Sequence, residues 1–155
     1  YIPIHGRLDK VSVLHEQGMP VSIEDAPWED IARYSEQSDD EVRLKVILLD
    51  AFRISRKTLT PEPMVSLKPF VLLFDEHYTE LYRFSEAEKR MQTAERMVFM
   101  GTSFSVNITS IALRYALSNN ARIEIVDPDP IDLNISGIKY HKMTASEYIS
   151  ESDHV

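Results

Sequence analysis

Three short groups of residues in this 155-residue chain combine side chains that could carry chemistry: His5-Gly6, Gly101-Thr102-Ser103 and Asp127. A histidine titrates near neutral pH and can act as a general base toward a hydroxyl group. A glycine followed by two hydroxyl residues allows close backbone approach and can bind a phosphate or a ribose. An acidic residue at the end of a strand can accept hydrogen bonds from ribose hydroxyls. The second and third groups together favour a pocket for a ligand that contains ribose and phosphate.

Each group also has an ordinary structural interpretation. Gly-Thr-Ser is a common turn sequence, and Asp127-Pro128 is a common way to begin a turn. A histidine such as His5, taken alone, is more often structural than catalytic. The pocket is favoured because Gly101 and Asp127 follow two successive predicted strands, and ligands of open parallel sheets bind beyond the carboxyl ends of the strands.

The elements that must position these groups alternate in the second part of the chain. Continuous apolar runs predict buried strands, and apolar residues three to four positions apart predict helices. The predicted strands cover residues 70–74, 96–100, 123–126 and 137–141. The predicted helices cover residues 76–94 (in two pieces, because Ser85 could cap a second start), 108–117 and 145–149. This alternation indicates an α/β fold with a parallel sheet and crossover helices.

The first part of the chain predicts a smaller, mainly helical module. A short helix is expected from the region of Pro27 to Tyr34, and a longer one over residues 39–57. The sequence Ser38-Asp39-Asp40-Glu41 has the pattern of a capping box before that longer helix. Its many apolar residues imply burial around more than half of its surface. We therefore divide the chain into residues 1–13, 14–65 and 66–155.

Composition excludes several kinds of function. The net charge of −8 argues against direct nucleic-acid binding, which needs a track of lysine and arginine. No apolar run approaches the roughly 20 residues that span a bilayer, so no membrane partner is expected. The chain has no cysteine, which excludes disulfides and thiolate metal sites, and its histidines lack the helical spacing of a metal site. We predict no metal, and an intracellular location is favoured over secretion.

The order of the motifs resembles the second half of a sirtuin. Sirtuins carry a histidine-glycine, a small zinc module, an Arg/Lys-Pro-x-Val-Val-x-Phe-Gly-Glu segment, a strand ending in Gly-Thr-Ser, and a strand ending in Asn. The chain matches these elements in the same order with His5-Gly6, Lys68-Pro69 through Phe74-Asp75-Glu76, Ala94 through Val106, and Asp127. The order and approximate spacing hold over nearly all 155 residues.

The resemblance implies an NAD-consuming enzyme with a Rossmann-like NAD-binding domain. His5 would be the general base that activates a ribose hydroxyl of NAD after nicotinamide leaves. The residues that bind the cofactor would be Gly101, Thr102, Ser103, Asp127 and Ala145. Residues 1–13 and 66–155 would belong to this NAD-binding domain.

The resemblance also implies a substrate, namely a protein with an acylated lysine. Leu72 and Phe74 would line the tunnel for the acylated lysine, and the backbone around Asp75 and Glu76 would pair with the substrate peptide as an added strand. The reaction would be NAD-dependent lysine deacylation, in which nicotinamide is released and the acyl group passes to ADP-ribose.

The departures from the family pattern leave alternatives open. The zinc cysteines are absent, so residues 14–65 would form a zinc-free module, while Asp75 replaces a glycine and Ile108 a proline. The family's Gly-Ala-Gly-Ile-Ser loop and Thr-Gln-Asn-x-Asp segment have no counterpart, so an N-terminal half, in cis or in trans, would be needed to complete the NAD site. The alternatives are an NAD hydrolase or ADP-ribosyltransferase of the same fold, a catalytically inactive scaffold, and an unrelated α/β domain with coincidental motifs.

Overall fold

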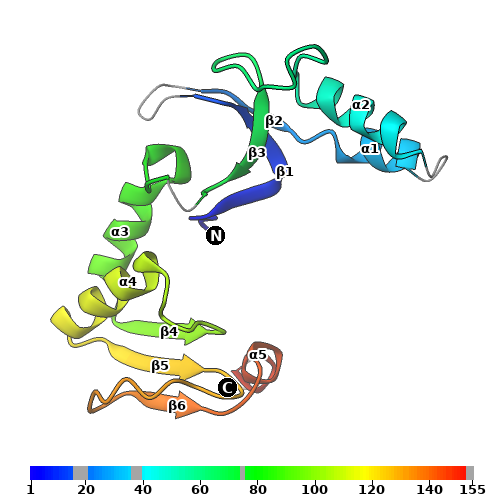
Figure 1. Cartoon of the computed structure of the whole chain (residues 1–155). Coiled ribbons are helices and arrows are strands. Elements are labelled where there is room, and N and C mark those ends of the chain that lie inside the picture. The colour runs from blue at the N-terminus through cyan, green and yellow to red at the C-terminus, as the bar shows by residue number, and fades with distance from the viewer. Residues whose placement is uncertain (16–20, 36–39, 74–75, 153–155) are drawn as a thin grey trace. The chain divides into compact units, whose positions relative to one another are not determined.

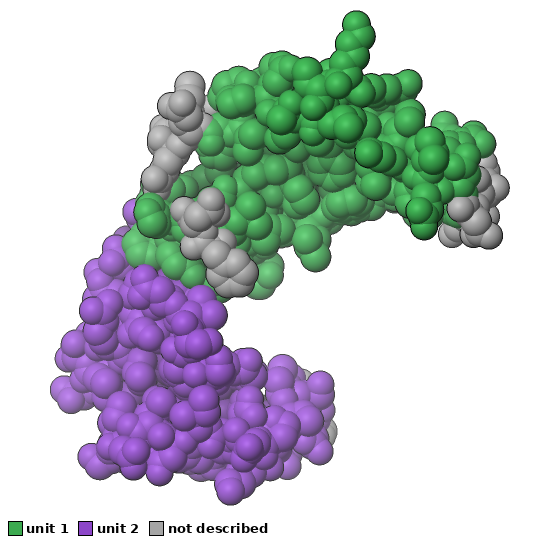
Figure 2. Space-filling model, viewed as in Figure 1, with its two compact units in different colours: residues 1–84 green, residues 85–155 purple. Residues whose placement is uncertain are grey.

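The computed structural model describes residues 1–15, 21–35, 40–73 and 76–152. The chain forms two compact units, Tyr1–Phe84 and Ser85–Val155 (Figure 2). Each unit is built around its own three-stranded sheet, which is antiparallel in the first unit and parallel in the second (Figure 1). The parallel sheet with its helices confirms the predicted α/β class.

The first unit contains the sheet β2-β1-β3, with β1 at Gly6–Val13, β2 at Ile23–Asp25 and β3 at Leu67–Val71. The central strand β1 buries Val11, which is 1% exposed. Phe70 of β3 is also buried, and its ring stacks on that of Tyr82 at 5.0 Å between centroids. These apolar contacts form the small core of the unit.

The strand predicted over residues 70–74 corresponds to β3, which begins and ends three residues earlier and pairs antiparallel with β1. Our expectation that it joins the parallel sheet is therefore corrected. An apolar run indicates burial on both faces but does not specify the partner strand. Pro69, which has no N–H to donate, fits within β3 because β3 is an edge strand of its sheet.

Two helices of the first unit lie within residues 14–65, for which the sequence predicts a helical module. They are α1 at Trp28–Ser35 and α2 at Glu41–Ala51. Asp40 caps α2, because its side chain accepts hydrogen bonds from the N–H groups of Val42 and Arg43 at 3.0 and 3.2 Å. Ser38 and Asp39, which belong to the predicted capping box, lie outside the described residues.

Helix α2 is shorter and more exposed than predicted. It ends at Ala51, and Arg53 just beyond it has the left-handed φ of 54°, which ends the helix. None of its residues is buried, and Val42 is 74% exposed. The expected burial around more than half of its surface is therefore wrong: within the described chain, α1 is the helix that packs against α2.

The segment that follows β3 forms two helical pieces, as Ser85 suggested. They are the 3₁₀ helix η1 at Glu80–Tyr82 and the helix α3 at Phe84–Gln92. Arg83 separates them with a left-handed φ of 56°. A residue in this conformation cannot continue a right-handed helix, which accounts for the break.

The second unit matches the predicted elements closely. Its parallel sheet has the order β4-β5-β6, with β4 at Arg96–Met100, β5 at Arg122–Val126 and β6 at Lys139–His141. Helix α4, Asn107–Ser118, connects β4 to β5, and α5, Ala145–Ser152, follows β6. Helix α4 covers one face of the sheet (Figure 1).

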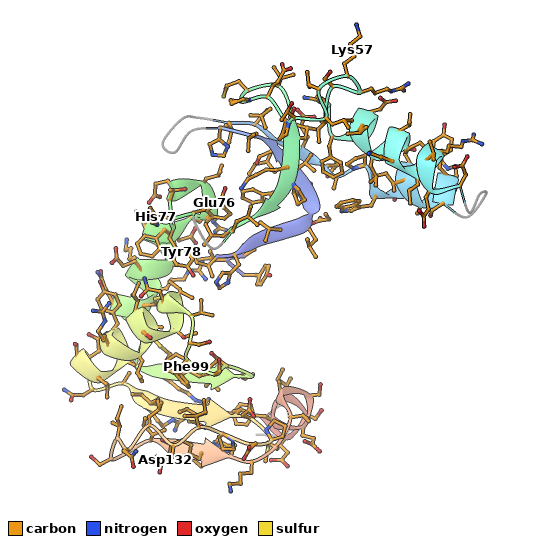
Figure 3. All side chains as sticks on the ribbon, viewed as in Figure 1. Lys57, Glu76, His77, Tyr78, Phe99 and Asp132 are labelled. Carbon is orange, nitrogen blue, oxygen red and sulfur yellow. The ribbon has the colours of Figure 1, made fainter. Side chains whose placement is uncertain are left out.

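The core of the second unit lies between α4 and the sheet. Phe99, which Figure 3 labels on β4, packs with residues of the same core: Ala112, Ala116, Ile123 and Ile125. Because side chains alternate along a strand, residues 122, 124 and 126 of β5 lie on the opposite face of the sheet. In the part of the chain that the structure describes, the helices are too short or too polar to cross a bilayer.

Gly6 lies against β3 more closely than any side chain would permit. A Cβ atom at Gly6 would lie 2.0 Å from the carbonyl oxygen of Phe70, and the φ of Gly6 is +86°. Gly137 has nearly the same φ of +87°, but a Cβ atom there would have no neighbour within 4 Å. Both the positive φ and the lack of space therefore require glycine at position 6, whereas only the positive φ favours glycine at position 137.

We expect Gly6→Ala to lower the free energy of unfolding by roughly 3 kcal/mol, because it adds a backbone clash to the strain of a positive φ. Gly137→Ala should cost about 1 kcal/mol, because it adds strain alone. Urea unfolding measures the loss of stability in both variants. Circular dichroism follows the whole chain, and the fluorescence of Trp28 follows the first unit. Equal losses in the two variants would show that the approach to Phe70 does not constrain position 6.

Candidate functional site

The carboxyl ends of the three parallel strands meet at one edge of the second unit's sheet. Met100, Val126 and His141 are paired across this edge. The N–H of Gly101 donates to the Val126 carbonyl at 3.0 Å, and the N–H of Asp127 donates to the His141 carbonyl at 3.1 Å. The structure therefore brings Gly101 and Asp127 to the same edge, as the predicted strand order requires.

The loop after β4 is shaped by its glycine and its hydroxyl groups. Gly101 has a φ of +59°, with open space where a side chain would be. The Thr102 hydroxyl accepts a hydrogen bond from the N–H of Phe104 at 3.2 Å, and the hydroxyls of Ser103 and Ser105 lie 2.7 Å apart. Because Ser103 and Ser105 are exposed, their hydroxyls are accessible to a ligand.

Asp127 combines the two roles that its sequence context suggests. Its Oδ1 atom accepts a hydrogen bond from the N–H of Asp129 at 2.9 Å and so stabilises the turn. Among the described residues, no group donates a hydrogen bond to its Oδ2 atom. The turn thus holds a half-buried carboxylate at the sheet edge with one oxygen that can still accept a hydrogen bond.

Ala145 is the first residue of α5, which starts four residues after β6 ends. The preceding Thr144 and Glu147 form a capping box: the N–H and hydroxyl of Thr144 donate to Glu147 at 2.7 and 2.8 Å, and the Glu147 N–H donates back at 3.2 Å. The predicted cofactor-binding residues thus follow the ends of three neighbouring strands.

His5 lies in the first unit, immediately before β1, and its side chain is exposed. Its Nε2 atom lies 2.9 Å from the hydroxyl of Tyr78, and its carbonyl accepts a hydrogen bond from the N–H of Leu72 at 3.0 Å. The predicted catalytic residue and one predicted substrate residue, Leu72, are therefore neighbours. Sequence reasoning did not identify Tyr78.

Glu76 is held within its own segment rather than turned toward a ligand. Its carboxylate pairs with the ammonium group of Lys68 and accepts a hydrogen bond from the N–H of Leu73 at 2.9 Å. Figure 3 labels Glu76 with Tyr78 in the segment that follows β3. Phe74 and Asp75, the other predicted substrate residues, lie outside the described residues.

The predicted site residues fall into two groups, one in each unit. His5, Leu72 and Glu76 belong to the first unit, and the residues of the sheet edge belong to the second. The roles assigned to them remain predictions. So does the assignment of residues 1–13 and 66–84 to the NAD-binding domain.

A hollow of about 380 Å³ lies beside β4, between α3 and α4. Its walls are mainly apolar and include Met91, Met97, Phe99, Ile108 and Ala112. None of the predicted site residues lines it. The hollow is therefore separate from the predicted cofactor-binding residues at the sheet edge.

Sequence reasoning also missed a buried carboxylate beneath the sheet edge. Glu124 of β5 is 3% exposed and lies on the face opposite to α4. Its carboxylate forms ion pairs or hydrogen bonds with residues of three strands and one helix. These partners are Arg96 of β4 at 2.8 Å, Arg122 of β5 at 3.1 Å, His141 of β6 at 2.8 Å and Tyr148 of α5 at 2.9 Å. The sequence feature that could have revealed it is a single charged residue between Ile123 and Ile125 in an otherwise apolar run.

These partners change the acidity of Glu124. Burial alone would raise its pKa, but hydrogen bonds with Arg96, Tyr148 and His141 outweigh burial and lower the pKa from 4.5 to about 2. Burial and the neighbouring carboxylate also raise the pKa of the Tyr148 hydroxyl. Glu124 is therefore ionised throughout the neutral range and connects three strands and α5 at the carboxyl edge.

We expect Glu124→Gln to lower the free energy of unfolding by about 3 kcal/mol at pH 7, because the pKa of Glu124 lies well below its ordinary value. The stabilisation is complete above pH 4.5 and is lost as the pH falls through about 2. The difference between wild type and variant should therefore shrink by about half at pH 3.

Urea unfolding followed by circular dichroism at both pH values measures this difference. Glu95→Gln is the matched control, since Glu95 is an exposed carboxylate in the same unit. A loss that is the same at pH 7 and pH 3 would contradict the assigned ionisation of Glu124.

Comparison with known proteins identifies the relatives of this chain. No family model matches it. Over 67 residues it is 37% identical to the NAD-dependent deacetylase sir2E of Dictyostelium discoideum, an alignment that covers 42% of this chain and 20% of that protein. The chain thus spans one fifth of the curated relative that it matches.

Solved structures extend the likeness to nearly the whole chain. The structure of Sir2Tm bound to a propionylated peptide matches 99% of this chain and 54% of its own, with a TM-score of 0.62 and 14% identity. A structure described as "Structural Basis for the Mechanism and Regulation of Sir2 Enzymes" matches 97% of this chain and 51% of its own, with a TM-score of 0.60 and 18% identity. The chain therefore spans about half the length of these solved relatives.

These likenesses disfavour the interpretation as an unrelated α/β domain with coincidental motifs, although β3 does not join the parallel sheet as that expectation required. This chain is therefore similar in sequence to a curated sirtuin over 67 residues, and it shares the fold of solved sirtuin structures over nearly its whole length.

Proposed function

We propose that this chain supplies the general base and part of the NAD site of a sirtuin-like enzyme. The observation that carries the proposal is the convergence of Gly101, Asp127 and the start of α5 at the carboxyl edge of one parallel sheet. This edge is where dinucleotides bind in related architectures. An N-terminal half, in cis or in trans, completes the site.

The residues at the sheet edge fit NAD. Gly101 leaves open space for a phosphate or ribose, and Thr102 and Ser103 offer hydroxyl groups next to it. Asp127 holds one carboxylate oxygen ready to accept from the hydroxyls of the adenine ribose, and Ala145 lies near the adenine. When bound, NAD supplies the ribose carbon from which nicotinamide departs.

His5 takes up the proton of a ribose hydroxyl in this proposal. An imidazole suits the task, because its neutral form carries a nitrogen lone pair that can accept a proton, and the side chain is exposed here. The hydrogen bond from the Leu72 N–H to the His5 carbonyl fixes the backbone of this residue beside the proposed substrate segment.

We assign the reaction to lysine deacylation, with an acylated lysine in a protein as the substrate. Support comes from relatives whose structures contain a propionylated or an acetylated peptide. In this proposal, Leu72 and Phe74 have the role of lining the path of the acylated lysine, and the backbone around Asp75 and Glu76 has the role of pairing with the peptide.

NAD hydrolysis or ADP-ribosyl transfer is the second candidate. It is favoured by Asp75, which adds a side chain and a charge where the family pattern has a glycine. Such a residue hinders close approach of a peptide backbone but leaves the chemistry of NAD unaffected.

A catalytically inactive scaffold is the third candidate. Helix α2 favours it, because Val42 and Leu48 leave apolar surface exposed in the module that replaces the zinc site. A scaffold does not need the imidazole of His5, so the His5→Ala experiment below separates it from both enzymes.

The first test incubates the intact protein with NAD, with and without an acetyl-lysine peptide. We expect peptide-dependent release of nicotinamide and a steady-state turnover that falls at least about 100-fold in His5→Ala, because the general base is lost. His77→Ala is the matched control, since His77 is exposed in the same unit. Nicotinamide release without peptide would favour the hydrolase, and a wild type that neither binds nor cleaves NAD would favour the scaffold.

The second test concerns the adenine ribose. Asp127→Ala should weaken NAD binding about tenfold, because it removes a charged hydrogen-bond acceptor. Asp129→Ala is the control, because it keeps the backbone N–H that donates to Asp127 and removes only an exposed carboxylate. Isothermal titration calorimetry measures both affinities; an unchanged affinity in Asp127→Ala would remove this residue from the proposed site.

A further inference from the structure

Tyr78 contacts the proposed general base directly. Its hydroxyl lies 2.9 Å from Nε2 of His5, and the two rings meet edge to face with centroids 5.7 Å apart. The Tyr78 ring in turn stacks on Phe84 at 5.8 Å, with an interplanar angle of 21°. Tyr78 is therefore supported on one side while it holds the imidazole on the other.

The backbone around His5 is held against β3 and the residue after it. The N–H of Leu72 donates to the His5 carbonyl at 3.0 Å, and Gly6 packs against the Phe70 carbonyl at a distance that only glycine permits. The backbone of His5 is thus fixed against β3 and the residue that follows it.

The hydrogen bond between Tyr78 and His5 bears on which nitrogen of the imidazole carries the proton. A neutral imidazole has one nitrogen that donates and one that accepts. Among the described residues, the Tyr78 hydroxyl is the one side-chain hydrogen-bond partner of His5, and it engages Nε2. A tyrosine oxygen can accept from an Nε2–H group, which leaves the lone pair of the imidazole on Nδ1.

We propose that Tyr78 is a positioning residue for His5: its oxygen accepts the Nε2–H hydrogen bond and so fixes the tautomer in which Nδ1 is the base. This proposal rests on the proposed function of His5. In the step itself, His5 uses its Nδ1 lone pair to form a bond to the proton of a ribose hydroxyl, whose O–H bond breaks. The imidazolium then carries both protons, and the Tyr78 oxygen stabilises the one on Nε2.

The tautomer of His5 can be measured without any turnover. We propose ¹⁵N NMR of the imidazole nitrogens in the full chain at a pH at which the histidines are neutral, with His5→Gln to assign the His5 signals. Wild type should contain His5 as the Nε2–H tautomer, and Tyr78→Phe should shift it to a mixture. An Nδ1–H tautomer in wild type, or identical shifts in Tyr78→Phe, would overturn the proposal.

Kinetics of the intact protein supply the second readout. Tyr78→Phe retains the ring and should lower kcat about tenfold while KM for NAD stays unchanged, because orientation of the base is lost but binding is not. Tyr82→Phe is the matched control: it removes a phenol hydroxyl four residues away, on a ring that stacks on Phe70 rather than on His5. An unchanged or increased kcat in Tyr78→Phe would overturn the positioning role.

The two readouts separate this proposal from the function on which it rests. If wild type neither binds nor cleaves NAD, the proposed function fails, while the NMR spectra still decide whether Tyr78 fixes the His5 tautomer. If wild type is active, His5→Ala is inactive and Tyr78→Phe equals wild type, the function stands and the role of Tyr78 is rejected.

Discussion

Charge compensation at Glu124 is the interaction on which the carboxyl edge of the second unit depends. A carboxylate that is 3% exposed would be strongly unfavourable without partners, and here cations and hydrogen-bond donors surround it. Because those partners come from β4, β5, β6 and α5, satisfying one charge fixes the relative positions of four elements. His141 belongs to this group, and its carbonyl receives the N–H of Asp127, so the buried charge supports the residue proposed to bind ribose.

The first unit depends on a different constraint, namely the close approach of Gly6 to the carbonyl of Phe70. This contact brings the start of β1 next to the end of β3, so that His5 lies beside Leu72 and Tyr78, from which it is far apart in the sequence. The two residues of the histidine-glycine pair thus have linked roles. Gly6 allows the close approach to the Phe70 carbonyl, and His5, which precedes it, is thereby placed beside the phenol of Tyr78.

Local patterns predicted the second unit well because its elements are regular and strongly periodic. The strands β4 and β5, the helix α4 and the break near Ser85 all follow from apolar runs, helical spacing and turn residues. The same patterns failed in the first unit. Helix α2 looks buried by composition, yet no residue in it is buried, because burial depends on what packs against a helix and not on its own residues.

The sequence by itself determined the chemical inventory and its order along the chain: a histidine-glycine, a Gly-Thr-Ser loop and an acidic residue after successive strands, with no cysteine for a zinc module. That order was enough to indicate the sirtuin resemblance and the α/β class. Only the tertiary structure decided that β3 pairs with β1, that Tyr78 contacts His5, and that Glu124 is surrounded by four partners. Apart from the pair of Arg122 and Glu124, these are contacts between residues distant in sequence, and the periodicity of a single segment carries no information about its partner.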